Sequence, residues 1–498
     1  MTAARTDEDD IAALARGGRT NVMGFVLRLA ARIPFLFIAG RLYGPETLGR
    51  FAYAILIVEF VAQLATLGLR RGLAELLSRD DRPHAHMVAD GLLVGMLASA
   101  LGAALLIALP QLMFPNSAIH GLDRFLPLMI FAIVATDIAL AALAYRFDIV
   151  STVRARAIVE PWTISIAAGA LYFYSARDGL ILAYVTSLVA ALLTALWPLW
   201  RSYGLPWGWK PDGTALIALT RRNLPLAAAD AAEWGSRRLD LAILGLFASP
   251  AVVGIYYVAQ QVASLPQKLK TSFDPILGPV ITRNLQCKNY GEIAHQVGQV
   301  GFWIIAAQAG IALALGIPGE AVMGLIGPEF VGGTGALAFL LAAEVAAATA
   351  VVSESALVYI ARHRNFLISL GMLAVQALLS IALIELVETL PVKPELRGLY
   401  QAAAVACGLM LALGIGSVIK GKLLSRLLSQ RLSIWRSALI WAVLAAAMLG
   451  VVIVSLPARF EWVELAIGIP AILGLYGWII WTKGFGPEDR ILFRKSRG

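Results

Sequence analysis

The sequence predicts an all-α integral membrane protein with about fourteen transmembrane helices, each long enough to cross a hydrocarbon core of roughly 30 Å. Three observations support this fold class: the composition, the length of the apolar runs, and the placement of the basic residues. Of 498 residues, 59% are hydrophobic and only 15% are charged, whereas soluble domains carry about 25% charged residues. A water-soluble fold of this length could not bury so much apolar surface.

The apolar runs follow one another in three groups, separated by polar segments with Gly, Pro and basic residues. The first group covers 21–43, 49–69, 87–113, 123–145, 155–175 and 179–199. The second covers 224–247, 251–273, 296–317, 334–360, 366–388 and 398–419, and the last covers 434–456 and 462–482. We therefore expect two six-helix bundles, at 1–210 and 211–424, and two additional helices with a tail at 425–498.

The distribution of charge predicts the topology. The polar first ten residues lack a basic segment followed at once by an apolar one, so the first span is expected to remain in the mature protein. With both termini in the cytoplasm, most of the 41 basic residues fall in inside segments, as the positive-inside rule requires. This predicts a multi-pass protein of the bacterial inner membrane and explains the net charge of +9 without a nucleic-acid partner.

The two six-helix groups resemble each other. A gapless shift aligns Ile38 and Gly40 with Ile243 and Gly245, and Arg32 with Arg237. Chance matches of Gly and Ala are the alternative explanation. Because six spans lie between equivalent positions, a true repeat would be parallel, with a pseudo-two-fold axis along the membrane normal.

Charged side chains within spans are the candidate functional residues, since such groups normally face a bundle interior or a wet cavity. Arg28 and Arg32 share one face of the first span. In the seventh, Asp230, Glu233, Arg237 and Asp240 follow a 3-4-3 spacing that predicts one stripe, with Arg238 beside it. One hypothesis is a purely structural set of ion pairs, such as Glu233 with Arg237 four residues later. The other is a cavity in which Arg28, Arg32, Arg237 and Arg238 bind an anionic, phosphate-containing group.

Other features give weaker predictions. Isolated carboxylates that could relay protons or bind a cation, or simply pack between helices, are Glu59, Asp137, Glu160, Glu344 and Glu354. Phosphate-loop, HExxH and GxSxG motifs are absent from the sequence. Cys287 and Cys407 are far apart and share no CxxC spacing, so we expect neither a disulfide nor a metal site.

The segment 40–54, GRLYGPETLGRFAYA, followed by ATLGLR at 65–70, resembles the first hairpin of polysaccharide flippases of the MOP superfamily, the Wzx-like proteins. Arg238-Leu-Asp240, the segment VGIYY at 253–257, Leu265-Pro266 and Pro275 are similar to the family pattern around spans seven and eight. The similarity in organisation covers almost the whole chain, and the specific motifs cover a small part of it.

The resemblance implies alternating access and transport of an undecaprenyl-pyrophosphate-linked oligosaccharide for cell-surface polysaccharide. It places substrate-binding cations at Arg28, Arg32, Arg237 and Arg238, while Asp230, Glu233, Asp240 and Asp137 are candidates for ion coupling or for the cavity wall. We expect no cofactor and no enzymatic activity, with membrane lipid and polysaccharide polymerase or assembly proteins as partners. The alternatives are a lipid II flippase, a cation-coupled multidrug exporter that uses Asp137 or Asp230, and a membrane-embedded polymerase, which would need longer external loops.

Overall fold

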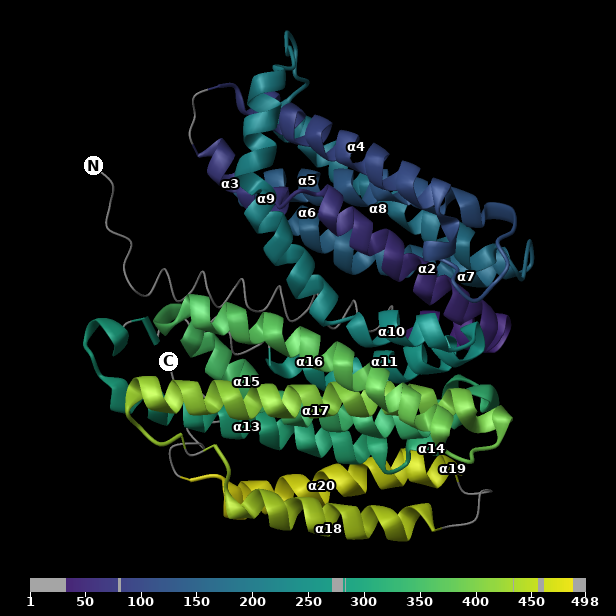
Figure 1. The fold of residues 1–498 in the computed structure, drawn as a ribbon, viewed down its shortest axis with the longest axis vertical. Coiled ribbons are helices and arrows are strands. Elements are labelled where there is room, and N and C mark those ends of the chain that lie inside the picture. The colour runs from purple at the N-terminus through teal and green to yellow at the C-terminus, as the bar shows by residue number, and fades with distance from the viewer. Residues whose placement is uncertain are drawn as a thin grey trace. The chain divides into compact units, whose positions relative to one another are not determined.

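The computed structural model describes residues 33–78, 82–270, 281–282, 284–432, 434–455 and 461–486. These residues form helices joined by short loops, without a β-strand in the described ranges, and this confirms the all-α prediction (Figure 1). They fall into two compact units that divide between Arg238 and Leu239. We call these the N-terminal unit and the C-terminal unit. Arg28 and Arg32 lie outside the described residues.

The N-terminal unit is built around α5 (Met129–Tyr145), which packs against α2 (Gly44–Ala65), α3 (Leu69–Leu77), α4 (His84–Ala108) and α8 (Gly179–Tyr203). Its central position follows from its composition, because 17 residues contain Asp137 as their one charged group. The remaining elements are η1 (Ala39–Tyr43), η2 (Pro110–Leu112), η3 (Gly121–Leu128), α6 (Ile149–Val153), η4 (Arg154–Val159), α7 (Glu160–Tyr172) and α9 (Gly213–Ser236).

The C-terminal unit is built around α15 (Thr334–Ile360) and α17 (Pro394–Leu428), which pack against each other. The helix α15 also contacts α11 (Pro250–Lys270) and α13 (Tyr290–Gly316), while α16 (Arg362–Thr389) packs on α17. The other elements are α10 (Leu239–Phe247), α14 (Gly319–Ile326), η5 (Pro328–Gly333), α18 (Ser437–Val454), α19 (Glu461–Val463), η7 (Glu464–Gly468), α20 (Ile469–Ile479) and η8 (Ile480–Gly484).

Ten helical segments of the described chain are long and apolar enough to cross a membrane. The count of fourteen is not confirmed. Two expected spans are interrupted: 155–175 begins as the π-helix η4, which carries Arg156, and 224–247 divides into α9 and α10 at Arg237 and Arg238. Charged residues thus fall where an unbroken apolar helix was expected.

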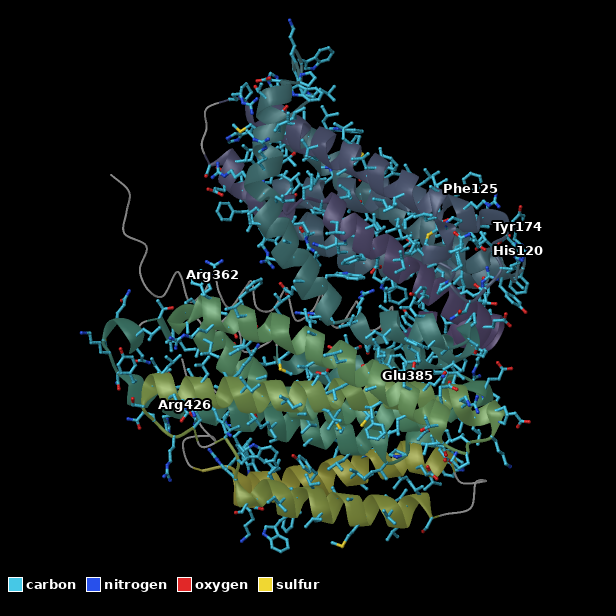
Figure 2. All side chains as sticks on the ribbon, viewed as in Figure 1. His120, Phe125, Tyr174, Arg362, Glu385 and Arg426 are labelled. Carbon is cyan, nitrogen blue, oxygen red and sulfur yellow. The ribbon has the colours of Figure 1, made fainter. Side chains whose placement is uncertain are left out.

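Large apolar side chains cover much of the helix surface. Leu101 on α4 is 76% exposed, Leu378 on α16 is 69% exposed and Trp441 on α18 is 68% exposed. Exposure of these side chains to water would be unfavourable, whereas contact with the hydrocarbon core of a membrane is favourable. Figure 2 shows Arg362 and Arg426 toward one end of the C-terminal unit and Glu385 toward the other.

The last two long helices pack on α13. Residues of α13, α18 and α20, including Phe302, Leu439 and Tyr476, belong to one buried core. The hydroxyl of Tyr476 donates a 2.8 Å hydrogen bond to the carbonyl of Ala306. A Cβ atom on Gly310 would lie only 2.9 Å from the Tyr476 ring, so this glycine permits the close approach of α20 to α13.

We expect Gly310→Leu to push α20 away from α13 and to destabilise the protein by about 1–3 kcal/mol, the usual effect of overpacking. The thermal unfolding midpoint of the detergent-solubilised protein measures this. Gly474→Leu on α20 is the control, because a Cβ there meets no described atom within 4 Å. Equal midpoints for both variants would contradict the packing described.

Candidate functional site

The charged segment of span seven is not one continuous helix. The helix α9 starts at Gly213, where the side chain of Asp212 accepts a hydrogen bond from the Thr214 amide, and ends at Ser236. The Arg238 amide then bonds the Gly235 carbonyl at 3.0 Å in a turn before α10 begins. The expected single stripe from Asp230 to Asp240 is therefore wrong, because the helical register is lost at Arg237 and Arg238.

Asp240 belongs to a separate, closed polar group in the C-terminal unit. It is only 1% exposed. The hydroxyl of Tyr256 donates to its Oδ2 at 2.7 Å, and the Gln260 amide nitrogen lies 3.2 Å and 3.0 Å from its two carboxylate oxygens. Both carboxylate oxygens thus have donors, as burial of a carboxylate requires.

Ion pairs connect the last two turns of α9 to α3. Arg71 on α3 contacts Asp230 at 3.2 Å and Glu233 at 2.9 Å. Glu233 also contacts Arg237 at 3.3 Å, which confirms the predicted pair four residues apart. The side chains of Glu233 and Arg237 are 54% and 53% exposed, so the Arg237 guanidinium is reachable from outside although it is paired.

Arg238 is held by a different element. One of its Nη nitrogens donates to Glu59 on α2 at 2.8 Å, and its guanidinium lies over the ring of Trp234, 4.8 Å from the centroid. The carboxylate and the ring restrict the side chain from two directions. A guanidinium has five N–H donors, whereas the described contacts assign one from each of Arg237 and Arg238 to a carboxylate. Both arginines can therefore still bind an anion.

A second cluster crosses three elements of the N-terminal unit. Arg156 on η4 pairs with Asp137 on α5 and with Glu160 on α7, the latter at 2.6 Å. The three side chains are 16–28% exposed. Tyr184 on α8 interacts electrostatically with both this cluster and the Glu59–Arg238 pair. Two carboxylates against one guanidinium leave an excess of negative charge, which suits a proton or a small cation.

The structure thus brings Asp230, Glu233 and Arg237 together, and places Arg238, Asp137 and Asp240 in three other groups. The sequence analysis did not single out Arg71, the partner of α9, because this residue follows the apolar run 49–69 and lies outside every expected span. The signal was available: Leu69, Leu73 and Leu77 repeat every four residues, and each is 0% exposed. That spacing predicts an amphipathic helix which would hold Arg71 on its polar face.

The helical fold is shared with membrane transporters of the MOP superfamily. Similar folds occur in the lipid II flippase MurJ in an inward closed conformation (12% identity, TM-score 0.70, 95% of this chain and 100% of that one). An inward-facing multidrug resistance transporter of the MATE family is also similar, with 14% identity and a TM-score of 0.63 over 81% of this chain and 98% of that one. A third similar structure is a MOP superfamily transporter from Pyrococcus furiosus, with 13% identity and a TM-score of 0.54 over 83% of this chain and 96% of that one. At such identities the likeness shows the fold alone.

The chain belongs to the family described as polysaccharide biosynthesis protein, whose family model matches residues 38–315. The matched range contains both charged clusters and the helix break. No curated protein matches the chain. The prediction of a polysaccharide flippase family within the MOP superfamily is confirmed.

We expect Arg156→Gln to destabilise the protein by on the order of 1–3 kcal/mol, because it leaves two half-buried carboxylates side by side without a cation. Adding Asp137→Asn should recover part of this loss, and unfolding of the purified protein measures both. Arg177→Gln is the control. Its partner, Asp178, lies 3.7 Å away, and the Arg177 side chain is 53% exposed, so this longer and more solvated pair contributes little. Equal losses from Arg156→Gln and Arg177→Gln would contradict a structural role for the cluster.

Proposed function

We propose that this protein is a flippase that moves an undecaprenyl-pyrophosphate-linked oligosaccharide across the bacterial inner membrane by alternating access. Membership of the polysaccharide biosynthesis family supports a substrate of this class. The observation that carries the proposal is the exposed arginine pair at the break between α9 and α10.

The arginines suit a pyrophosphate because a guanidinium can present two parallel N–H groups to one phosphate. Arg237 and Arg238 carry positive charge at the end of one unit, and Arg28 and Arg32 remain part of the proposal from the sequence alone. Glu233 and Glu59 already partner the two described arginines. A pyrophosphate would compete with these carboxylates, so binding would be weaker than to free arginines. For a transporter this favours release on the far side.

The carboxylates have a proposed second role. Asp137, Asp230, Glu233 and Asp240 are candidates for ion coupling or for the wall of the transport cavity. The cluster of Asp137, Arg156 and Glu160 fits coupling best, because it holds two carboxylates and one guanidinium and so has a carboxylate to offer a coupling cation.

The remaining assignments follow from the same proposal. The transporting bundles would comprise residues 1–210 and 211–424, with 425–498 as an accessory part. Both termini would be cytoplasmic, as the basic segments indicate. The protein would work without a cofactor and without an enzymatic step. Partners would be the lipid-linked oligosaccharide, membrane lipid, and the polymerase or assembly proteins that receive the glycan.

We expect Arg237→Ala and Arg238→Ala to leave insertion intact and to lower the surface polysaccharide at least tenfold. Removing a charge-assisted contact weakens binding by roughly 1.5–3 kcal/mol, and a factor of ten corresponds to 1.4 kcal/mol. Arg32→Ala should act in the same way. Extraction of lipid-linked oligosaccharide from the cytoplasmic leaflet of cells that express each variant measures the defect.

Arg177→Ala is the matched control, because Arg177 is also 53% exposed and also paired with a carboxylate. Normal surface polysaccharide in both the Arg237 and Arg238 variants would reject the phosphate site. Accumulation of lipid II in place of oligosaccharide would make the protein a lipid II flippase instead. Lipid II is the substrate of the structurally similar flippase MurJ.

The cluster around Arg156 favours a second candidate, a cation-coupled multidrug exporter, and a multidrug resistance transporter of the MATE family has a similar fold. The two functions are separable. A flippase should give no efflux of a cationic dye from intact cells, and Asp137→Asn should slow glycan export. Dye efflux by the native chain that Asp137→Asn abolishes would instead establish the exporter.

A further inference from the structure

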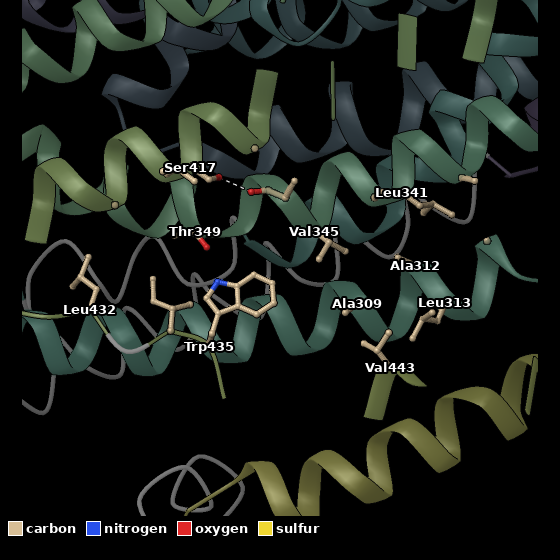
Figure 3. Close-up of a pocket in the computed structure, with 18 of the residues that line it drawn as sticks. Ala309, Ala312, Leu313, Leu341, Val345, Thr349, Ser417, Leu432, Trp435 and Val443 are labelled. Carbon is tan, nitrogen blue, oxygen red and sulfur yellow. Dashed lines mark hydrogen bonds between the residues drawn. The ribbon is translucent and has the colours of Figure 1, made fainter. Parts of the chain in front are cut away.

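A groove of about 980 Å³ lies within the C-terminal unit (Figure 3). Its walls come from α13, α15, α17 and α18 and from the segment between α17 and α18. Most of its lining is small or apolar, and includes Ala312, Leu341, Val345 and Val443. Neither Arg237 nor Arg238 lines it, so the groove is distinct from the site described above.

One part of the lining is polar and basic. Lys422 on the last turns of α17 and Arg431 just beyond it both line the groove, together with Trp435. Figure 3 shows Leu432 near one end, Leu313, Leu341 and Val443 toward the other, and the Trp435 ring between them. The groove is therefore apolar along most of its length and cationic at the end of α17.

The turn after α17 brings Arg431 to the groove. Ser429 adopts a left-handed conformation with φ 53°, the hydroxyl of Ser425 donates to the Gln430 carbonyl at 2.6 Å, and the chain then runs back along the groove. Lys422 and Arg431 are both exposed, and the described part of the chain provides no ion-pair partner for either. Two cations thus line an apolar groove, and the residues that the structure describes offer neither of them a counter-ion.

We propose that this groove binds an anionic phospholipid of the membrane, with its acyl chains along the apolar walls and its phosphate between Lys422 and Arg431. Charge complementarity selects the occupant. Basic pockets between transmembrane helices on the cytoplasmic side bind anionic head groups, and a nearby cation contributes about 1 kcal/mol. The segment after α17 is one that the positive-inside rule assigns to the cytoplasm. Trp435, 62% exposed, is a residue type enriched at that interface.

A lipid in this position would fill a gap that side chains leave open. It would contact α13, α15, α17 and α18, all of which contribute to the lining. The accessory helix α18 would then be joined to the bundle by lipid as well as by protein. The activity and stability of the protein should therefore depend on the anionic lipid content, whatever substrate the arginine site carries.

The experiment titrates the purified full-length protein with phosphatidylglycerol or with phosphatidylcholine of the same acyl chains, and counts bound lipid by native mass spectrometry. Lys422→Gln with Arg431→Gln should weaken phosphatidylglycerol binding about tenfold or more. The matched control is Arg362→Gln with Arg426→Gln. These two exposed arginines lie toward one end of the same unit and do not line the groove (Figure 2).

A second pair of variants tests the apolar part. Gly414 lines the groove on α17, and a Cβ there meets no described atom within 4 Å, so Gly414→Phe should occupy the groove without a clash. It should lower phosphatidylglycerol binding to a similar degree. Gly371→Phe is the control, because Gly371 is also helical and also open but lies outside the groove.

Preference for phosphatidylglycerol that both groove variants lose and both controls keep would support the proposal. Equal binding of phosphatidylcholine, or an unchanged affinity in the Lys422 and Arg431 variant, would overturn it. Displacement of phosphatidylglycerol by a neutral polyprenol at equal concentration would also overturn it, because the groove would then hold a prenyl chain. The experiment measures lipid binding and not glycan export. A negative result would therefore reject the lipid site without affecting the proposed flippase function.

Discussion

Charge in a low-dielectric surrounding is the constraint on which this structure depends. An ionised side chain within a bilayer is strongly disfavoured unless it meets an opposite charge, a hydrogen-bond partner or water. The charged side chains described above have such partners in one of two arrangements, closed or partly exposed. Arg156 and Asp240 are closed in by their own partners, whereas Arg237 and Arg238 keep half-open surfaces. The first arrangement stabilises a fold and the second leaves a site.

The helix break between α9 and α10 is a consequence of the same constraint. A continuous helix would carry Asp230, Glu233, Arg237 and Asp240 on one face. The break instead separates Asp240, which is buried with Tyr256, from the group that Arg71 fastens to α3. Each part of the stripe then finds partners within its own unit. A membrane protein thus divides its intramembrane charge among small neutral or nearly neutral groups.

The groove of the C-terminal unit extends this principle to the lipid itself. Where helices carry small residues, as at Gly414 and Ala312, the protein leaves apolar space that hydrocarbon can enter at little cost. The cations at its end face a leaflet that carries negative charge. If both proposals hold, an anionic lipid would partner the two cations of the groove, and the proposed export site at Arg237 and Arg238 would belong to a protein whose accessory helix α18 contacts that lipid.

Composition and the length of the apolar runs determined the fold class, because a span of about 20 apolar residues has few other uses. The pair of Glu233 and Arg237 also followed from sequence, since helical spacing is local. The tertiary structure alone decided that α9 ends at Ser236, that Arg71 and Glu59 reach the charges of α9 and its terminal turn, and that Arg156 joins three elements. Those contacts join residues distant in the chain, and no local pattern encodes which helices meet.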